Sequence, residues 1–76
     1  MATVVLKIPD IFCEHCEYTV KRALTPVPGV QSVLVDIPAK QVIVAYDEAL
    51  VDLDRIKAIL RAEDYPVASV SAEPGP

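Results

Sequence analysis

Residues 3–24 read TVVLKIPDIFCEHCEYTVKRAL, and they contain a strand pattern, a break and a helix pattern in that order. In residues 3–8 the side chains alternate with a period of two, which is typical of a half-buried strand. The alternate positions predicted to face the core are Val4, Leu6 and Ile8. Pro9 ends this strand because proline has no backbone N–H to donate within a sheet.

A helix is predicted to begin near Cys16, after a loop over residues 11–15. Its apolar residues recur at helical spacing and would form one buried face. These residues are Cys16, Val20, Ala23 and Leu24. The run over residues 25–29 contains prolines, which remove backbone donors and end the helix. Val27 is therefore expected to pack from just beyond the helix end.

Two alternating runs, residues 32–37 and 42–46, predict a β-hairpin with its turn at residues 38–40. The turn contains neither Asn-Gly nor Asp-Gly, the pairs most typical of short hairpins. A short last strand is predicted over residues 66–71.

A second helix is predicted between the hairpin and the last strand. Asp52 is expected to cap its N-terminus, with Val51 and Ile56 placed as a hydrophobic staple. Its apolar face is predicted from the spacing of Leu53, Ile56, Ile59 and Leu60.

The order of the elements, β-α-β followed by β-α-β, predicts an α+β protein with a ferredoxin-like βαββαβ sandwich. It should contain a four-stranded antiparallel sheet with two helices on one face, because the crossover connections are right-handed. Residues 1–70 would form this domain, and residues 71–76 a disordered tail or linker. The segment from Cys13 to Cys16 would then lie at one edge of the domain, where a partner can reach it.

Composition and charge exclude several classes of function. The net charge of −4 and the scattered basic residues argue against nucleic-acid binding. No apolar run approaches the roughly 18 to 20 residues of a membrane span, and no positively charged start precedes an apolar leader. A cytoplasmic protein without membrane insertion is expected, in a compartment where thiols stay reduced. The sequence contains no recognisable general base, nucleophile pair or phosphate loop, so an enzyme is not expected.

The chain has two cysteines, Cys13 and Cys16, and their spacing indicates chemistry rather than a structural disulfide. A disulfide between them would close a very short loop and add little stability. One thiol is expected in the loop and the other in the first helical turn, where the helix N-terminus lowers thiol pKa values. Glu14 and Glu17 oppose this effect, since they place negative charge beside the thiols.

The supply of ligands favours a soft metal ion with few ligands. A structural zinc site has four ligands, whereas this sequence offers Cys13, Cys16 and His15 within a single tetrapeptide. Cu(I) is soft and prefers thiolates, its tolerance of two-coordination fits this supply, and Hg(II) fits for the same reason. An ion with so few ligands at an exposed edge is open to the thiols of a partner, which permits transfer through shared-ligand intermediates.

The run Ile11-Phe12-Cys13-Glu14-His15-Cys16, within the βαββαβ pattern, resembles the heavy-metal-associated domain family. The similarity extends over about residues 4–70 and includes the stretches 19–24, 27–30 and 64–67. This family includes bacterial copper chaperones, the N-terminal domains of copper- and zinc-exporting P-type ATPases, and mercuric-ion-binding proteins. The resemblance implies metal ligation by Cys13 and Cys16, and a loop tyrosine, Tyr65, packed near the site.

Several positions differ from the family's motif, Gly-Met-Thr/Ser/His-Cys-x-x-Cys. Asp10 stands at the glycine position, and Asp64 stands where a glycine normally precedes the tyrosine. Ile11 replaces a buried methionine and keeps an apolar residue there. Phe12 occupies the small polar position, where it would either shield the metal from water or contact a partner. These differences bear on metal identity and affinity.

The predicted function is to bind Cu(I) through Cys13 and Cys16 and to transfer it to a partner protein, as a metallochaperone or metal-loading domain does. The partner would be a metal-transporting P-type ATPase or another thiol-bearing acceptor. A monomer is expected, with a metal-bridged dimer as the alternative. His15 is expected to face solvent, with ligation as a secondary role.

Other functions remain open for the cysteine pair. One is a thiol–disulfide redox module. Another is a Hg(II)-, Zn(II)- or Cd(II)-binding domain of a larger transporter or reductase. A third is a purely structural pair, since free cysteines are often buried as small hydrophobic residues.

Overall fold

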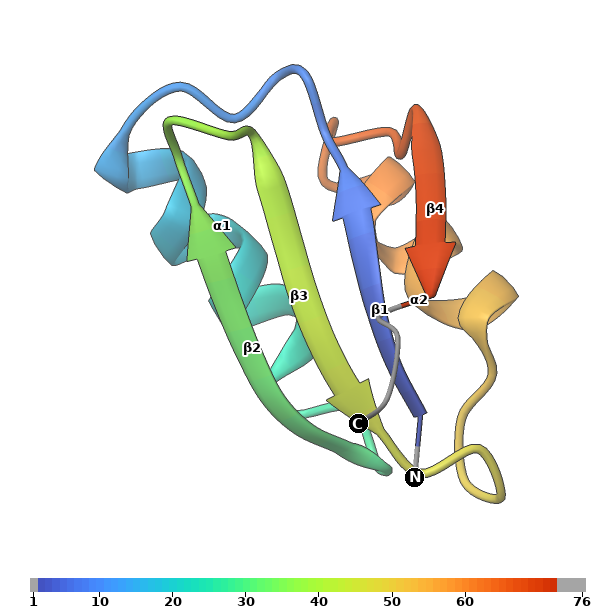
Figure 1. Ribbon diagram of the computed structural model, residues 1–76. Helices are drawn as coiled ribbons and strands as arrows, with labels where there is room; N and C mark the ends of the chain where they lie inside the picture. The colour runs from blue at the N-terminus through green and yellow to red at the C-terminus, as the bar shows by residue number, and fades with distance from the viewer. Residues whose placement is uncertain (1, 73–76) are drawn as a thin grey trace.

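The computed structural model describes residues 2–72, whose strands form one antiparallel sheet in the order β2-β3-β1-β4 (Figure 1). In chain order the elements are β1 (Ala2–Lys7), α1 (Glu14–Leu24), β2 (Val30–Asp36), β3 (Gln41–Tyr46), α2 (Leu53–Ala62) and β4 (Ser69–Ala72). Both helices cover the same face of the sheet. The predicted ferredoxin-like arrangement is therefore confirmed. Within residues 2–72, no helix is long and apolar enough to cross a membrane.

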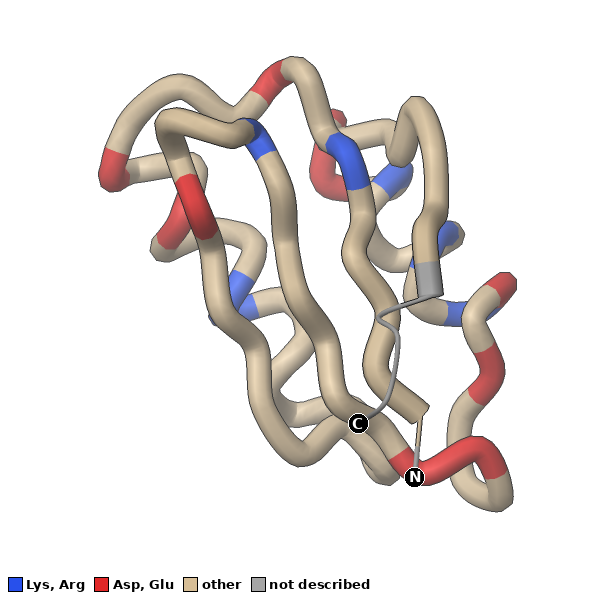
Figure 2. The backbone as a smooth tube through the Cα atoms, in the orientation of Figure 1, with Lys and Arg blue, Asp and Glu red and all other residues tan. Residues whose placement is uncertain are grey.

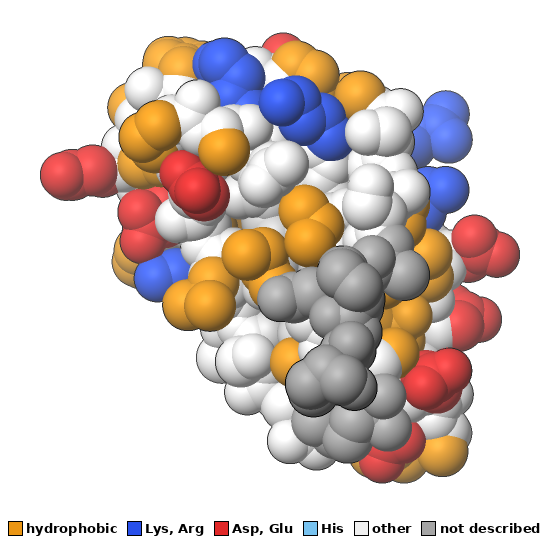
Figure 3. Space-filling view, in the orientation of Figure 1, with side chains coloured by type: hydrophobic (Ala, Val, Ile, Leu, Met, Phe, Trp, Pro, Cys, Tyr) orange, Lys and Arg blue, Asp and Glu red, His pale blue; other side chains and the backbone are white. Residues whose placement is uncertain are grey.

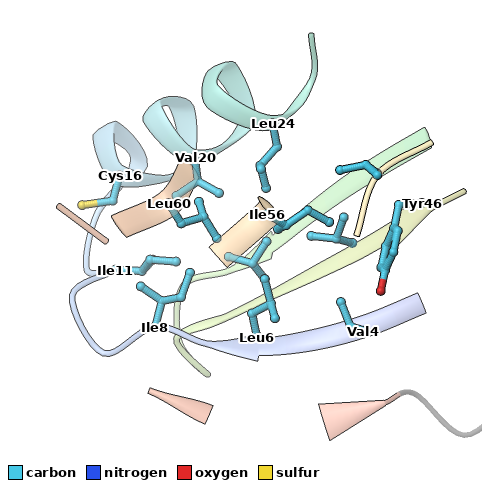
Figure 4. Close-up of a cluster of buried hydrophobic side chains, with 13 residues drawn as sticks. Val4, Leu6, Ile8, Ile11, Cys16, Val20, Leu24, Tyr46, Ile56 and Leu60 are labelled. Atoms are coloured by element: carbon cyan, nitrogen blue, oxygen red, sulfur yellow. The ribbon is translucent and has the colours of Figure 1, made fainter. Parts of the chain in front are cut away.

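The core lies between the two helices and the inner face of the sheet (Figure 4). Its fully buried residues come from both layers: Leu6, Val42 and Val44 from the sheet, and Val20, Leu24, Ile56 and Leu60 from the helices. Full burial of one such side chain contributes roughly 1.5–3 kcal/mol. The predicted inner positions of the first strand are confirmed, because Val4 and Ile8 are buried with Leu6. Val27 packs against this core from beyond the end of α1, as expected.

Helix α1 begins at Glu14, earlier than the predicted start near Cys16. Cys13 is the N-cap residue, and its backbone carbonyl accepts hydrogen bonds from Cys16 N at 3.0 Å and from Glu17 N at 3.3 Å. Its side chain makes no capping hydrogen bond. The helix therefore begins two residues before the predicted start, at an N-cap residue that lacks the side-chain acceptor by which a helix start is usually recognised in a sequence.

Strand β4 begins at Ser69, whereas the sequence predicted a strand from residue 66. Pairing with β1 starts only at Lys7 and Ser69, and Ala68 N donates to the Lys7 carbonyl at 2.8 Å just before it. Ser71, predicted both to end the strand and to begin the tail, continues this ladder opposite Val5, and Ala72 of the predicted tail continues it opposite Val4. The rest of the predicted tail, residues 73–76, lies outside the described residues.

The predicted cap of the second helix is confirmed. Asp52 is the N-cap of α2, and its Oδ1 accepts a hydrogen bond from Arg55 N at 2.8 Å. The two residues predicted to form a hydrophobic staple, Val51 and Ile56, are both buried in the core. This end of α2 is therefore held by a polar cap and by apolar burial together.

Candidate metal centre

The segment between β1 and α1 is held by buried aliphatic side chains on both sides of Pro9 and Asp10. Ile8 and Ile11 have no exposed surface, and Ile11 N donates to the Ile8 carbonyl at 3.1 Å. Ile11 thus fills the apolar position expected of it. Cys13 follows two residues after Ile11, so the buried Ile11 side chain fixes the backbone just before the cysteine pair.

Cys13 lies at the N-cap of α1 and Cys16 in its first turn, as predicted for two converging thiols. Both cysteines are free, and their Sγ atoms are 3.7 Å apart. Cys16 is only 2% exposed, whereas Cys13 is half-buried. Figure 4 shows Cys16 at one end of the core cluster with its sulfur pointing away from the other labelled side chains. The pair therefore consists of an inner and an outer thiol at the edge of the core.

Hydrogen bonds at the inner thiol favour its ionised form. Burial acts to raise the pKa of the Cys16 thiol, because it disfavours the thiolate. Hydrogen bonds with the Tyr65 hydroxyl, the backbone of Phe12 and Cys13 act the other way, and together they hold this pKa below its ordinary value of 9.0. Since the thiolate is the form that binds metals, a lowered pKa prepares Cys16 for ligation.

Tyr65 lies beside Cys16, so the expected position of the loop tyrosine near the thiols agrees with the geometry. The hydrogen bond to Cys16 is the largest cause that raises the pKa of Tyr65 to about 12, and burial and the negative charge of the cysteines add to it. A hydrogen bond with Thr19 acts in the opposite direction. The Tyr65 hydroxyl consequently keeps its proton to a higher pH than an ordinary tyrosine does and remains a donor to the Cys16 sulfur.

The backbone before Tyr65 explains why a glycine is usual at that position. Asp64 has a φ of 68°, in the left-handed region that glycine adopts without steric cost. Aspartate visits this region more readily than most residues, because its short side chain can hydrogen-bond locally. Tyr65 N then donates to the Leu60 carbonyl at 2.9 Å, which holds the tyrosine against the end of α2.

The remaining predicted site residues lie outside the thiol pair. His15 is exposed, as expected. Phe12 is 71% exposed, so it is not part of the core, and contact with a partner remains open to it. Within residues 2–72, no three side chains among His, Cys, Asp and Glu are grouped so that they could hold a metal ion. The described chain thus supplies a pair of thiols rather than the four ligands of a structural zinc site.

Lys40 was not predicted from the sequence as a site residue. Its Nζ donates to the Ile11 carbonyl at 3.0 Å, although the two residues are 29 positions apart. Figure 2 shows acidic positions along the loop before α1 and its first turn, and basic positions at the neighbouring ends of β1 and β3. The hairpin turn predicted at residues 38–40 was the only sequence signal that placed Lys40 at a strand end.

Comparisons with known proteins agree with this geometry. The model of the heavy-metal-associated domain matches residues 5–66. The chain is 34% identical over 67 residues to the copper chaperone CopZ of Staphylococcus haemolyticus, covering 88% of this chain and 98% of that protein. It is 33% identical over 64 residues to the mercuric transport protein periplasmic component of Pseudomonas aeruginosa, covering 84% of this chain and 70% of that protein. A solved CopZ metallochaperone superposes with a TM-score of 0.84 at 30% identity, over 88% of this chain and 100% of that one.

These matches show that the chain belongs to the heavy-metal-associated domain family. It is a heavy-metal-binding domain related to copper chaperones and to mercuric transport proteins. The family's domains carry metals and are not enzymes, which agrees with the prediction from the sequence.

Proposed function

We propose that this chain binds one Cu(I) ion between the sulfurs of Cys13 and Cys16 and transfers it to a thiol-bearing acceptor protein. The carrying observation is the pair of free thiols at the N-terminus of α1, 3.7 Å apart, with no third ligand grouped beside them in residues 2–72. Two metal–sulfur bonds of about 2.3 Å each can span such a distance. Cu(I) suits this set because it is soft and prefers thiolates.

Transfer would proceed by exchange of ligands, without a change in the oxidation state of copper. An acceptor thiolate first binds the ion beside Cys13, the more exposed thiol, and forms a three-coordinate intermediate. The bond between copper and Cys13 then breaks, and Cys13 regains a proton from water. A second acceptor thiolate then binds the ion in place of Cys16, which is released last because it is buried and hydrogen-bonded by Tyr65.

The acceptor we propose is a metal-transporting P-type ATPase or another protein that presents a thiol pair. Support comes from the similarity to CopZ, which is named as a copper chaperone. We place the exchange in the cytoplasm, where thiols stay reduced, with the chain acting as a monomer. Phe12 is exposed directly beside Cys13 and is suited to contact the acceptor.

An anaerobic titration tests the copper proposal. Reduced protein competes for Cu(I) with a coloured chelator, and the double variant Cys13→Ala/Cys16→Ala is titrated alongside. Wild type is expected to remove one equivalent of copper from the chelator, and the double variant none. Circular dichroism of the variant checks that the fold is kept. If wild type fails to compete for Cu(I), the proposal is wrong.

Hg(II) is the second candidate, and the similarity to a mercuric transport protein favours it. The same two proteins are therefore titrated with Hg(II), Zn(II) and Cd(II). Retention of Hg(II) without competition for Cu(I) would assign mercury to the site. If no metal is retained, the thiol–disulfide alternative is tested by measuring the reduction potential of the cysteine pair.

A further inference from the structure

Lys40 occupies an unusual backbone position opposite the loop that carries Cys13. It is the last residue before β3, and its φ of 55° lies in the left-handed region. This region costs an L-residue roughly 1–2 kcal/mol, so turns usually place Gly, Asn or Asp there. A lysine keeps this conformation only where contacts of its main chain or side chain offset the cost.

Both the main chain and the side chain of Lys40 bind the segment before α1. The Lys40 carbonyl accepts a hydrogen bond from Ile8 N at 2.9 Å. Its Nζ, part-buried, donates to the Ile11 carbonyl at 3.0 Å. The two hydrogen bonds hold this segment at the residue where it leaves β1 and again two residues before Cys13.

The positive charge of Lys40 lies beside the acidic loop that carries Cys13. Two thiolates and one Cu(I) ion sum to a net charge of −1, and Asp10, Glu14 and Glu17 add negative charge nearby. Figure 3 shows basic side chains gathered over the end of the sheet from which the loop before α1 departs in Figure 1. A hydrogen bond from an ammonium group is about twice as strong as one between neutral groups.

We propose that Lys40 is a positioning residue of the metal centre, which holds the Ile11 carbonyl and thereby fixes the backbone that presents Cys13 to the ion. The proposal rests on the proposed function of Cu(I) binding. Without the ammonium group the segment over residues 11–13 moves more, and the thiols lose part of their preorganisation for the metal.

The test compares three variants in the competitive Cu(I) titration. Lys40→Asn removes the ammonium group but tolerates the left-handed backbone. Lys40→Arg keeps a cationic donor. Lys7→Gln is the matched control, because it also removes a lysine at this end of the sheet, and the Lys7 Nζ donates to the Ala39 carbonyl at 3.1 Å, in the β2–β3 turn. We expect Lys40→Asn to bind Cu(I) about tenfold more weakly, with Lys40→Arg and Lys7→Gln close to wild type.

Amide hydrogen exchange at Phe12 and Cys13 in the metal-free protein provides a second readout, and Lys40→Asn is expected to exchange faster there. Equal losses of affinity in Lys40→Asn and Lys7→Gln would show an effect of net charge and overturn the proposal. So would unchanged affinity with a lowered unfolding temperature, which is a purely structural effect. If wild type binds no Cu(I), the proposed function fails. In that case the amide exchange at Phe12 and Cys13 still tests the positioning role of Lys40. Equal exchange rates in wild type and Lys40→Asn would overturn that role.

Discussion

At the scale of single residues, the two cysteines differ in burial although they are neighbours on one helical turn. Cys16 belongs to the core cluster, whereas Cys13 packs against it from a half-buried position. Cys16 is therefore part of the core as well as one of the two ligands proposed for the metal ion. Burial of a sulfur atom contributes to stability much as burial of a methylene does.

Substitution by alanine separates these two roles. Cys16→Ala is expected to lower the stability of the metal-free protein by about 1 kcal/mol, through lost burial and a small cavity. Cys13→Ala is expected to change stability far less. Each variant should lose tight Cu(I) binding. Urea unfolding of the reduced proteins measures the stabilities, and a large loss in Cys13→Ala would contradict the chemical reading of that residue.

The hydroxyl of Tyr65 is expected to control the reactivity of the inner thiol. In Tyr65→Phe the hydrogen bond that lowers the pKa of Cys16 is lost, so this pKa rises. The rate of alkylation at Cys16, followed by mass spectrometry against pH, should then reach its plateau at a higher pH than in wild type. Tyr18→Phe is the control, since Tyr18 is 62% exposed. Coincident profiles for wild type and Tyr65→Phe would contradict this role.

At the scale of helices and strands, periodicity predicted the buried faces, because burial acts on every second or every third to fourth residue of an element. It did not predict the start of α1, because the N-cap residue Cys13 makes no side-chain capping hydrogen bond. Nor did it predict the contact from Lys40 to Ile11, which joins residues far apart in sequence. Contacts of that kind depend on how connections meet in space, and a single sequence carries no local signal for them.

The connection between α1 and β2 depends on a glycine. Gly29 has a φ of 98°, and an added Cβ would lie 2.8 Å from Leu50 Cβ and 2.9 Å from Val51 Cγ1. Gly29→Ala is therefore expected to lower the free energy of unfolding by roughly 1–3 kcal/mol. Denaturant unfolding measures this loss. Asp64→Gly is the converse control: it relieves a positive φ and should leave stability unchanged or slightly higher. Equal stabilities of wild type and Gly29→Ala would show that this connection adapts without cost.

At the scale of the whole molecule, three connections meet at one end of the sheet: those between β1 and α1, between β2 and β3, and between α2 and β4 (Figure 1). They bring together the cysteines, Lys40 and Tyr65 from separate parts of the chain. Tyr46 lies at the other end, where it pairs with Ala2. The two tyrosines with raised pKa values thus lie at opposite ends of the domain.

These tyrosines predict how stability changes in alkaline solution. Burial, with Glu48 and Asp52, raises the pKa of Tyr46, and the pKa of Tyr65 rises from 10.0 to about 12. The folded state therefore keeps both protons after the unfolded chain has lost them. Their stabilising contribution is complete below pH 10. The contribution of Tyr65 is lost as the pH rises through about 12, and that of Tyr46 is lost as the pH rises through its own raised pKa. The lowered pKa of Cys16 acts in the opposite sense, because its contribution is present above pH 9.0 and is lost as the pH falls through the folded value.

Urea unfolding of the reduced, metal-free protein between pH 8 and pH 12 measures the balance of these contributions. Stability is expected to decline above pH 10, and the decline should be shallower in Tyr65→Phe and in Tyr46→Phe. Because the two residues lie at opposite ends of the sheet, their effects should add in the double variant. A decline of the same steepness in wild type and in the double variant would show that other groups control the alkaline limit. The hydrogen bond between Tyr65 and Cys16 would then make no measurable contribution to the free energy of unfolding.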